Sequence, residues 1–342
     1  MCIVNIIDRS FETPWKNLAY ETCLLEAVCN ENLRNHQKYA VLLLWQNDNT
    51  IVIGRNQNPW KECNMEYVEA NNIRIARRIT GGGAVYHDSG NINFSFILPS
   101  DIYNIQKTSS VIVEAFHNLG IQVEVSGRND ILIDQRKFSG NAYYRMDGAG
   151  LHHGTILVAS DNQKITSCLT PNKQKLKSKG IDSVKSRVVN VNSIYPDVTM
   201  TQIKESISRV FREKFADTQC DTQQNLNIDE KRFEKLTEQY SSDNWIYDDY
   251  TNVDNTISNH YDWGNIEIKF EFEDEKISKC KIVTDSLEVE VITRIEEILQ
   301  GSKLTKENLS QIYISRANLL NEQQERMFHD IMKLISDNIK QR

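Results

Sequence analysis

Two consecutive arginines followed by three consecutive glycines have the clearest chemical character in this 342-residue chain. Arg77 and Arg78 end a short apolar alternation, and Gly81–Gly83 follow after two residues. Because glycine has no side chain, the N–H groups of such a stretch can approach a ligand and form a concave site for an anion. Guanidinium groups suit phosphate or carboxylate. The stretch therefore indicates anion capture, most simply of a nucleotide phosphate, although an exposed basic hairpin loop is an equally open interpretation of this fragment alone.

The residues around the glycines exclude two familiar nucleotide-binding loops. The chain contains no G-x-x-x-x-G-K-[ST] sequence, so this is not a Walker A loop. A strand rather than a helix is expected after the glycines, which excludes the G-x-G-x-x-G loop of dinucleotide-binding proteins. Residues 91–96 alternate polar and apolar, and this predicts a strand with its apolar side buried and Asn91, Asn93 and Ser95 on the other side.

Composition and charge narrow the class of protein. The chain is 39% hydrophobic and 25% charged, as is usual for a soluble globular protein, and its length suits one large domain and a smaller one. A net charge of −7 argues against nucleic acid as the main partner. No apolar run approaches the length of a membrane span, and the first residues lack the features of a signal peptide. We therefore expect no contact with a membrane.

The number and spacing of the cysteines and histidines indicate the cellular compartment of the protein and argue against a metal site built from these residues. The seven cysteines form no C-x-x-C pair and no metal-like cluster. An odd, scattered set is typical of free thiols in a reducing environment, so we expect a cytoplasmic protein. Histidine is scarce, with seven residues, which argues against a histidine-rich metal site.

Apolar periodicity predicts strands and helices that do not alternate regularly, and this favours a mixed sheet in an α/β or α+β layout. Apolar runs at 41–45 and 50–54 bracket four polar residues, which is a hairpin signal. A second hairpin is expected where 131–133 and 137–142 flank a three-residue turn. The other predicted elements are strands at 3–7, 73–76, 91–96, 121–125 and 151–158, and helices after Pro14 and at 61–71, 107–119, 199–216 and 229–240.

The sequence changes character in its second half. Residues 171–187 form a lysine-rich loop, which is either a solvated face or a segment that closes over an anionic ligand. Residues 246–262 are polar and are interpreted as a linker between a domain of residues 1–245 and a domain of residues 263–342. A strand pair over 263–284 and helices near 287–300, 305–314 and 320–340 predict that the second domain is small and α+β.

Several short motifs occur in an order that resembles lipoate–protein ligase A. Each motif alone is weak, but the ordered set is specific and covers roughly residues 14–187. The tail after about residue 255 resembles the family's accessory domain through Asp262-Trp263-Gly264 and Thr284–Leu287. The motifs are Pro14-Trp15 with Asn17-Leu18-Ala19, Gly54–Asn64, the Arg77–Asp88 block, Ser126–Asp130, Lys137-x-Ser139-Gly140-x-Ala142, His152–Thr155, and Lys179-Gly180-Ile181-x-Ser183-Val184.

The resemblance implies a fold, a reaction and partners. The implied fold is a large α+β domain like that of biotin and lipoyl ligases, with mixed sheets flanked by helices, plus a small α+β C-terminal accessory domain. The implied reaction has two steps: lipoate and MgATP give lipoyl-AMP and pyrophosphate, and the lipoyl group then passes to a lysine of a carrier domain. The implied partners are the lipoyl carrier domains of 2-oxoacid dehydrogenase complexes and the H protein of the glycine cleavage system, with lipoate, ATP and Mg²⁺ as small molecules.

The resemblance also assigns roles to individual residues. Lys137 matches the family lysine that touches both the lipoate carboxyl and the α-phosphate, so it is the expected catalytic residue, and Asp130 is the candidate ligand for Mg²⁺. Trp45 and the histidines could equally be ordinary core residues. The expected lipoate-binding residues are Glu21, Trp45, Arg78, His87, Lys137 and His153. The expected ATP- and adenylate-binding residues are Arg78, Gly81, Gly82, Gly83, Ala84, Val85, Tyr86, Lys137, Lys179 and Gly180.

Two other functions stay open at this point. One is a lipoyl or octanoyl transferase of the same superfamily that uses a preformed acyl donor; the cysteine-dependent kind needs a thiolate beside the pocket, and no matched site motif places a cysteine there. The other is a non-catalytic lipoyl-binding homologue, which the joint presence of Arg78, the glycines and Lys137 argues against.

Overall fold

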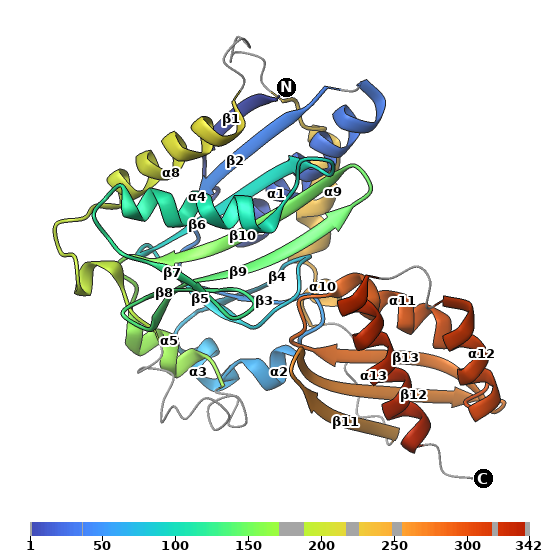
Figure 1. Cartoon of the computed structure of the whole chain (residues 1–342). Helices are drawn as coiled ribbons and strands as arrows, with labels where there is room; N and C mark the ends of the chain where they lie inside the picture. Colours follow the sequence, from blue (N-terminus) through green and yellow to red (C-terminus); the bar gives the residue numbers. More distant parts are fainter. Residues whose placement is uncertain are drawn as a thin grey trace. The chain divides into compact units, whose positions relative to one another are not determined.

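The structure is a computed structural model, in which the chain forms two compact units (Figure 1). The first unit comprises Met1–Ile53, Pro59–Arg78 and Ala84–Asp248, and the second comprises Gly54–Asn58, Ile79–Gly83 and Asp249–Arg342. The expected α+β fold with mixed sheets is confirmed. The structure describes residues 2–35, 37–170, 188–216, 226–247, 255–316 and 321–338.

A seven-stranded sheet organises the first unit, with the strand order β1-β2-β6-β10-β9-β8-β7. β1 and β2 are parallel and the other neighbours are antiparallel, so the sheet is mixed as expected. Its strands are β1 (Ile3–Asp8), β2 (Tyr39–Trp45), β6 (Asn91–Pro99), β7 (Glu124–Ser126), β8 (Asp130–Ile133), β9 (Arg136–Met146) and β10 (Ala149–Leu157).

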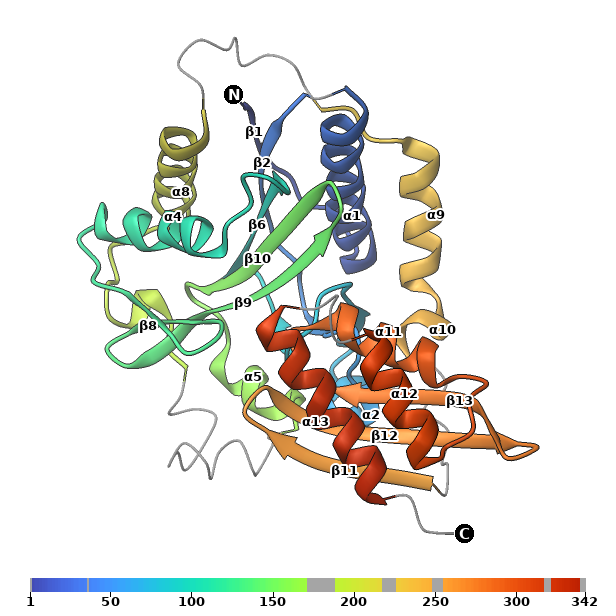
Figure 2. The ribbon, with the colours of Figure 1, turned by 45° about the vertical axis from the view of Figure 1, so that its right-hand side comes forward.

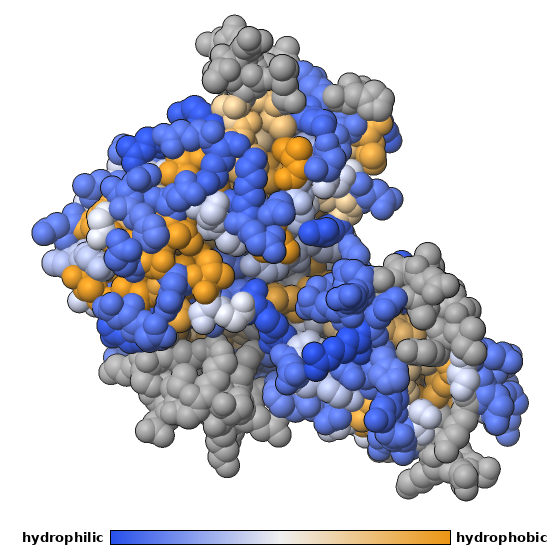
Figure 3. All heavy atoms as spheres, in the orientation of Figure 1, coloured by the Kyte–Doolittle hydropathy of each residue, from blue (hydrophilic) through white to orange (hydrophobic). Residues whose placement is uncertain are grey.

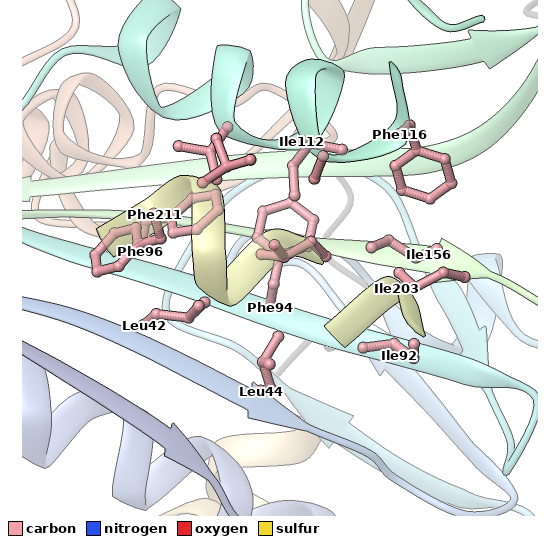
Figure 4. Packing of buried hydrophobic residues seen from close by; sticks show 14 of the residues in the cluster. Leu42, Leu44, Ile92, Phe94, Phe96, Ile112, Phe116, Ile156, Ile203 and Phe211 are labelled. Atoms are coloured by element: carbon pink, nitrogen blue, oxygen red, sulfur yellow. The ribbon is translucent and has the colours of Figure 1, made fainter. Parts of the chain in front are cut away.

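The main hydrophobic core lies on one face of this sheet, under α4 (Ile105–His117) and α8 (Met200–Phe215). Alternate residues of β6 point into it, and Phe94 and Phe96 are fully buried there. Figure 4 shows Phe96 beside Phe211 of α8, and their stacked ring centroids are 5.4 Å apart. Burying each such side chain contributes roughly 1.5–3 kcal/mol, so this face holds the sheet rigid.

The opposite face of the sheet is covered by α1 (Pro14–Asn30), and α9 (Glu230–Ser241) packs along α1 (Figures 1 and 2). Thr13 caps α1 by accepting a hydrogen bond from the backbone N–H of Lys16, and proline occupies the first helical position, where its missing N–H costs nothing. Because 12 of the 17 residues of α1 are buried, even its polar residues must find partners inside the protein.

A three-stranded sheet, ordered β4-β3-β5, lies in the same unit and corrects the first predicted hairpin. β3 (Thr50–Ile53) pairs with β4 (Arg74–Arg77) and with β5 (Val85–His87), whereas β2 pairs with β1 and β6. The two apolar runs therefore belong to different sheets, and the hairpin prediction was wrong. This sheet packs against α2 (Pro59–Glu62), α3 (Met65–Ala70), α5 (Asn162–Cys168) and α10 (Asp243–Ile246) around its own small core.

The described residues of the second unit form a three-stranded sheet with the order β11-β12-β13 and three helices. Its core packs Ile268 of the sheet with Ile292 and Phe328 of the helices. The expected linker over residues 246–262 is corrected by β11, because seven residues of that range form an edge strand. The elements are β11 (Asn255–Tyr261), β12 (Gly264–Glu273), β13 (Lys276–Thr284), α11 (Val289–Leu299), α12 (Lys306–Arg316) and α13 (Glu322–Asn338).

Two further predictions of secondary structure, the second hairpin and the strand at 121–125, can be compared with the structure. The second predicted hairpin is confirmed with a shorter turn, in which Asp134 and Gln135 both have positive φ, as type I′ turns require. The strand predicted at 121–125 forms only over Glu124–Ser126. Hydrophilic residues predominate on the visible surface (Figure 3). Among the described residues, no helix is both long enough and apolar enough to cross a membrane.

Candidate active site

Two rows of side chains cross the face of the large sheet that lies under α1. The antiparallel registers align Leu43, Ser95 and His153 in one row and Trp45, Asn93 and Thr155 in the next. These residues alternate along β6 and β10 with those of the main core, so they point to the opposite side. The expected placement of Asn91, Asn93 and Ser95 away from the apolar side is confirmed, and this second side is buried as well.

Glu21 of α1 is the centre of a buried polar cluster on these rows. Ser95 Oγ donates a hydrogen bond to Glu21 Oε1 at 2.5 Å, and His153 Nδ1 lies 2.9 Å from the same oxygen. Trp45 Nε1 donates to Ser95 Oγ at 2.9 Å, which ties the indole to the carboxylate through one hydroxyl. The structure therefore brings together three residues that the sequence assigned to lipoate, namely Glu21, Trp45 and His153, and adds Ser95 to them.

Arg78 places a buried positive charge next to this cluster. It follows β4, its Nη1 donates to the carbonyl oxygen of Val52 at 3.1 Å, and its side chain is buried. Burial lowers the pKa of Arg78 to about 10, and the opposite charge of Glu21 partly counters that shift. Arg78 still carries a full charge at neutral pH, so the site holds a cation that only an anionic group can balance well.

Arg77 has a different role from Arg78. Its Nε donates to the carbonyl oxygen of Trp245 at 2.7 Å and its Nη2 to that of Ile246 at 2.5 Å. These carbonyls end α10, where the helix dipole favours a positive charge. Trp245 Nε1 donates back to the carbonyl oxygen of Arg77 at 2.9 Å. Arg77 thus anchors a helix, and the interpretation of the pair as an exposed basic loop was wrong.

His87, at the end of β5, faces the polar cluster from the small sheet. Its ring lies edge-on to Trp45 with 6.3 Å between centroids. Asn47 Nδ2 is 3.1 Å from His87 Nδ1. Burial, together with the nearby charges of Arg78 and His153, lowers the pKa of His87 to about 3, so the ring is neutral at physiological pH.

His152 points to the other side of β10 and serves the core. Its Nδ1 lies 2.7 Å from Thr108 Oγ1 and its Nε2 lies 2.9 Å from Asn141 Oδ1. Burial, with a smaller contribution from His153, lowers the pKa of His152 to about 3. Two adjacent histidines therefore separate into a site residue and a structural one because successive strand residues face opposite sides.

Lys137 lies at the edge of the rows, on β9. Its ammonium nitrogen is 2.7 Å from Asp130 Oδ1 of the neighbouring strand. A β-bulge, at which Ile131 pairs with Ser139 and Leu132 with Lys137, sets this position. Gly140 leaves room for the ammonium, because a Cβ there would lie 2.7 Å from Lys137 Nζ. Sequence reasoning identified Lys137 and Asp130, and the structure pairs them directly.

Thr155 connects the lysine to the row that contains the tryptophan. Its Oγ1 accepts a hydrogen bond from the N–H of Gly140 at 3.3 Å, and it aligns with Asn93 across the strand pair. The line from Trp45 through Asn93 and Thr155 to Gly140 crosses three strand spacings, or roughly 14 Å.

The glycine stretch belongs to the second unit. Gly82 has a φ of +91°, which favours glycine, and its N–H donates to the carbonyl oxygen of Ser286 at 2.9 Å. A Cβ on Gly81 would lie 2.1 Å from that same oxygen, so this position also demands glycine. The stretch thus approaches the backbone at Ser286 closely, and one of its N–H groups is bonded within its own unit. The expected role of its N–H groups in anion binding stays a prediction.

The remaining predicted nucleotide residues are placed as follows. Ala84 and Val85 are half-buried, and Tyr86 points into the small core, where its hydroxyl donates to Asn49 Oδ1 at 2.9 Å. Lys179 and Gly180, with the whole lysine-rich loop, lie outside the described residues.

The thiols in the described ranges are not exposed to solvent. The described cysteines are free, and all of them are buried. Burial raises the pKa values of Cys63 and Cys168 to about 12. Both sit in the small core, not on the rows around Glu21. A thiolate nucleophile is therefore not among the groups that the described part of the chain offers.

A magnesium ion fits here only as a one-carboxylate site. Within the described ranges, no three residues of the types His, Cys, Asp and Glu gather in a metal-like group. Asp130 Oδ1 lies 2.7 Å from the ammonium nitrogen of Lys137. Mg²⁺ is commonly held by one or two carboxylates with the rest of its shell from water and substrate phosphates, so Asp130 suits an ion that arrives with a nucleotide.

Several solved structures share this fold. LipL1 of P. falciparum, solved in complex with lipoate, has a TM-score of 0.80 and 26% identity over 96% of this chain and 99% of its own. The bipartite lipoate protein ligase of Thermoplasma acidophilum, studied with its E2 lipoyl domain, has a TM-score of 0.62 and 25% identity over 75% of this chain and 100% of its own. A lipoate-protein ligase A bound with ATP shares the fold at a TM-score of 0.60 and 24% identity, over 72% and 98% of the two chains.

Family models cover most of the sequence. Residues 13–212 match the lipoyl protein ligase A/B catalytic domain, and residues 251–334 match the bacterial lipoate protein ligase C-terminus. The first match alone spans more than half of the 342 residues, and it contains Glu21, Trp45, Arg78 and Lys137. The chain belongs to the lipoyl protein ligase A/B family and carries the C-terminal domain of the bacterial lipoate protein ligases.

Proposed function

We propose that this protein is an ATP-dependent lipoate–protein ligase that forms lipoyl-AMP and then transfers the lipoyl group to a lysine of a lipoyl carrier domain. The observation that carries the proposal is the line across the sheet, with Trp45 toward one end and the Lys137–Asp130 pair at the other. A chain-like acyl group can lie on this line while its carboxylate meets a cation.

Activation joins two anions, and this chain supplies the groups that reduce their repulsion. A carboxylate oxygen of lipoate attacks the α-phosphorus of ATP, the bond from that phosphorus to the bridging oxygen breaks, and pyrophosphate leaves. The Lys137 ammonium is a compact charge that can touch the carboxylate and the α-phosphate together. The ammonium is preorganised, because it contacts Asp130 and occupies the space that Gly140 leaves open. A preorganised charge contributes most to such a step.

The other assigned residues divide between the two substrates. For lipoate we propose Glu21, Trp45, Arg78, His87, Lys137 and His153. For ATP and the adenylate we propose Arg78, the Gly81–Gly83 stretch, the backbone of Ala84–Tyr86, Lys137, and Lys179 with Gly180. Asp130 would hold Mg²⁺, which screens the phosphate charges when it arrives with ATP.

Transfer needs an uncharged amine. The carrier lysine must lose a proton, because its ammonium form predominates near neutral pH. Its nitrogen then attacks the acyl carbon of lipoyl-AMP, the bond from that carbon to the phosphate oxygen breaks, and AMP leaves with the phosphate able to take the proton. We propose carrier domains of 2-oxoacid dehydrogenase complexes and the glycine cleavage H protein as acceptors, and the cytoplasm as the place of action.

A transferase with a preformed acyl donor is the second candidate. The family that matches residues 13–212 is described for both ligase A and B catalytic domains, so this match alone does not separate ligase from transferase. The match of residues 251–334 to the lipoate protein ligase C-terminus favours the ligase. The high pKa values of Cys63 and Cys168 argue against a cysteine-dependent transferase.

One incubation tests the proposal. Protein, lipoate, MgATP and a purified lipoyl carrier domain are combined, and pyrophosphate and the mass of the carrier are followed. A ligase releases pyrophosphate and adds one lipoyl group to the carrier. Modification only when lipoyl-AMP or another acyl donor replaces lipoate and ATP would identify a transferase, and no modification with either donor would identify a non-catalytic homologue.

A further inference from the structure

Asn17 and Asn47 form a chain of oriented side-chain amides that ends at His87. The backbone N–H of Phe11 donates to Asn17 Oδ1 at 2.7 Å, so the oxygen of this amide faces the backbone donor and its nitrogen faces away. Asn17 Nδ2 donates to the carbonyl oxygen of Gln46 at 3.1 Å and to Asn47 Oδ1 at 2.8 Å. Two backbone groups therefore fix which way both amides point.

This orientation determines which nitrogen of His87 carries the proton. Because Asn47 Oδ1 is turned toward Asn17, its Nδ2 is the atom that faces His87 Nδ1, at 3.1 Å. An amide nitrogen can only donate, so His87 Nδ1 must accept. A neutral imidazole that accepts at Nδ1 carries its hydrogen on Nε2.

The resulting Nε2–H group is a buried donor that lacks an acceptor. His87 is 3% exposed, and its Nε2 has no hydrogen-bond partner among the described residues. Asn93 Nδ2, in the row next to Trp45, is in the same situation. Since buried donors are nearly always paired, two unpaired donors beside Trp45 indicate that a ligand completes them.

The position of His87 identifies the part of the ligand concerned. His87 lies against Trp45, at the far end of the roughly 14 Å line from the Lys137–Asp130 pair. If Lys137 takes the carboxylate, the end of the acyl chain that reaches His87 is the dithiolane ring of lipoate. Its sulfur atoms are weak hydrogen-bond acceptors, whereas the corresponding end of octanoate has none.

We propose that Asn17 and Asn47 are positioning residues that hold His87 as the Nε2–H tautomer, and that this N–H donates to a dithiolane sulfur and favours lipoate over octanoate. The inference rests on the proposed function, because it takes the acyl site as given. It assigns the sulfur-containing end of the substrate to His87 and adds a specificity role that depends on tautomer rather than on shape.

The tautomer is tested first and needs no variant. Two-dimensional ¹H–¹⁵N spectra of protein labelled at histidine nitrogens distinguish Nε2–H from Nδ1–H rings. We expect His87 to be the Nε2–H form, and its Nε2–H signal to shift when lipoate is added but to shift much less with octanoate. An Nδ1–H ring in the parent protein, or equal shifts with both acids, would overturn the inference.

Asn47→Asp tests the consequence for binding. Its carboxylate can still accept from Asn17 but can only accept from His87, so the ring must place a hydrogen on Nδ1. Calorimetry in the absence of ATP should show lipoate binding weakened about tenfold, the scale of one lost hydrogen bond, and octanoate binding unchanged within about twofold. Equal weakening for both acids would contradict the proposed role.

The matched control is Asn265→Asp in the second unit. There the side-chain oxygen of Asn265 already faces His260 Nδ1, at 2.8 Å, so the same substitution preserves the direction of the hydrogen bond. This variant should bind both acids like the parent. The calorimetry also separates this inference from the proposed function: a parent protein that binds neither acid would contradict the proposed function, whereas a parent that binds both with equal affinity would contradict only the role of His87.

Discussion

Lys137 and Asp130 face each other on adjacent antiparallel strands, with 2.7 Å between the ammonium nitrogen and a carboxylate oxygen. The bulge between Ile131 and Leu132 shifts the register so that this pair forms on the Thr155 side of the sheet. A lysine held in this way keeps its charge and its position before any substrate arrives, which is the property that activation of a carboxylate requires.

Gly140 should be needed for the position of this ammonium rather than for the fold. In Gly140→Ala the new methyl group would lie 2.7 Å from Lys137 Nζ and 2.8 Å from its Cε, so the flexible end of the lysine must move. We expect lipoate-dependent pyrophosphate release to fall at least tenfold, while the thermal midpoint changes by no more than a few degrees.

The outcome at Gly140 separates two roles of the glycine. A large drop in thermal midpoint would mean that the substitution destabilises the strand pair itself. Unchanged pyrophosphate release would mean that the position of the Lys137 ammonium next to Gly140 does not matter for activation.

The sequence put this lysine forward as a candidate but did not predict its surroundings. The resemblance to lipoate–protein ligase A proposed Lys137, Asp130, Glu21 and Trp45 as site residues. Ser95, which links Trp45 to Glu21, is a neutral residue on an alternating strand, and nothing in its neighbourhood distinguishes it. Its role depends on a register that only the folded sheet defines.

Long-range pairing also explains the errors in the fold. The runs at 41–45 and 50–54 have the local pattern of a hairpin, but each finds its partners far along the chain, and a local pattern does not contain that information. β11 was taken for a linker because it is a mostly exposed edge strand, in which Ile257 and Tyr261 pack partly against the core. Edge strands bury little and so show little hydrophobic alternation.

Trp45 should limit the size of the acyl group. Its indole is buried at the end of β2 and is oriented by the hydrogen bond to Ser95 Oγ. Trp45→Val replaces the indole by a much smaller side chain and should therefore allow carboxylic acids bulkier than lipoate to be activated. Pyrophosphate release with a series of acids measures this. The removal of a buried tryptophan costs roughly 3–5 kcal/mol, so the folded fraction must be checked by circular dichroism.

A variant at Trp45 that is folded, yet no more tolerant of bulky acids than the parent, would show that the tryptophan belongs to the core and not to the pocket.

No cysteine should be needed for transfer. Cys63→Ser and Cys168→Ser each remove a buried thiol whose pKa is about 12 and which is therefore protonated throughout the working range. We expect carrier modification to remain within about threefold of the parent when corrected for the folded fraction, because a buried hydroxyl costs stability. An acyl-enzyme thioester found by intact mass would contradict this and support the transferase.

Acid should destabilise the protein through its buried histidines. The pKa values of His87 and His152 are lowered from 6.5 to about 3, mainly by burial. Between these two pKa values the unfolded chain binds protons at both histidines that the folded chain does not bind. Folding stability must therefore fall as the pH drops below about 6.5, by up to about 1.4 kcal/mol per pH unit for each histidine. Urea unfolding between pH 7 and pH 5 measures this slope.

The histidine responsible can be identified by comparing variants. His152→Gln should reduce the slope of the free energy of unfolding against pH, whereas the exposed His117→Gln should leave it unchanged. A slope that is the same in both variants and the parent would show that the acid sensitivity arises elsewhere.

The activation step through Lys137 is the centre of the account. Lys137→Ala removes the preorganised ammonium and should reduce lipoate-dependent pyrophosphate release by about 10²–10³-fold. Lys137→Arg should not restore pyrophosphate release fully, because a planar guanidinium group does not reproduce the compact charge of an ammonium between two acceptors. With synthetic lipoyl-AMP in place of lipoate and ATP, transfer to the carrier should be impaired less than activation is.

The most direct measurement is therefore pyrophosphate release by Lys137→Ala with lipoate and MgATP, on protein shown to be folded by circular dichroism. The account predicts a loss of at least a hundredfold relative to the parent, with transfer from lipoyl-AMP reduced much less. Pyrophosphate release close to that of the parent would contradict the role of Lys137 and with it the proposed path of activation.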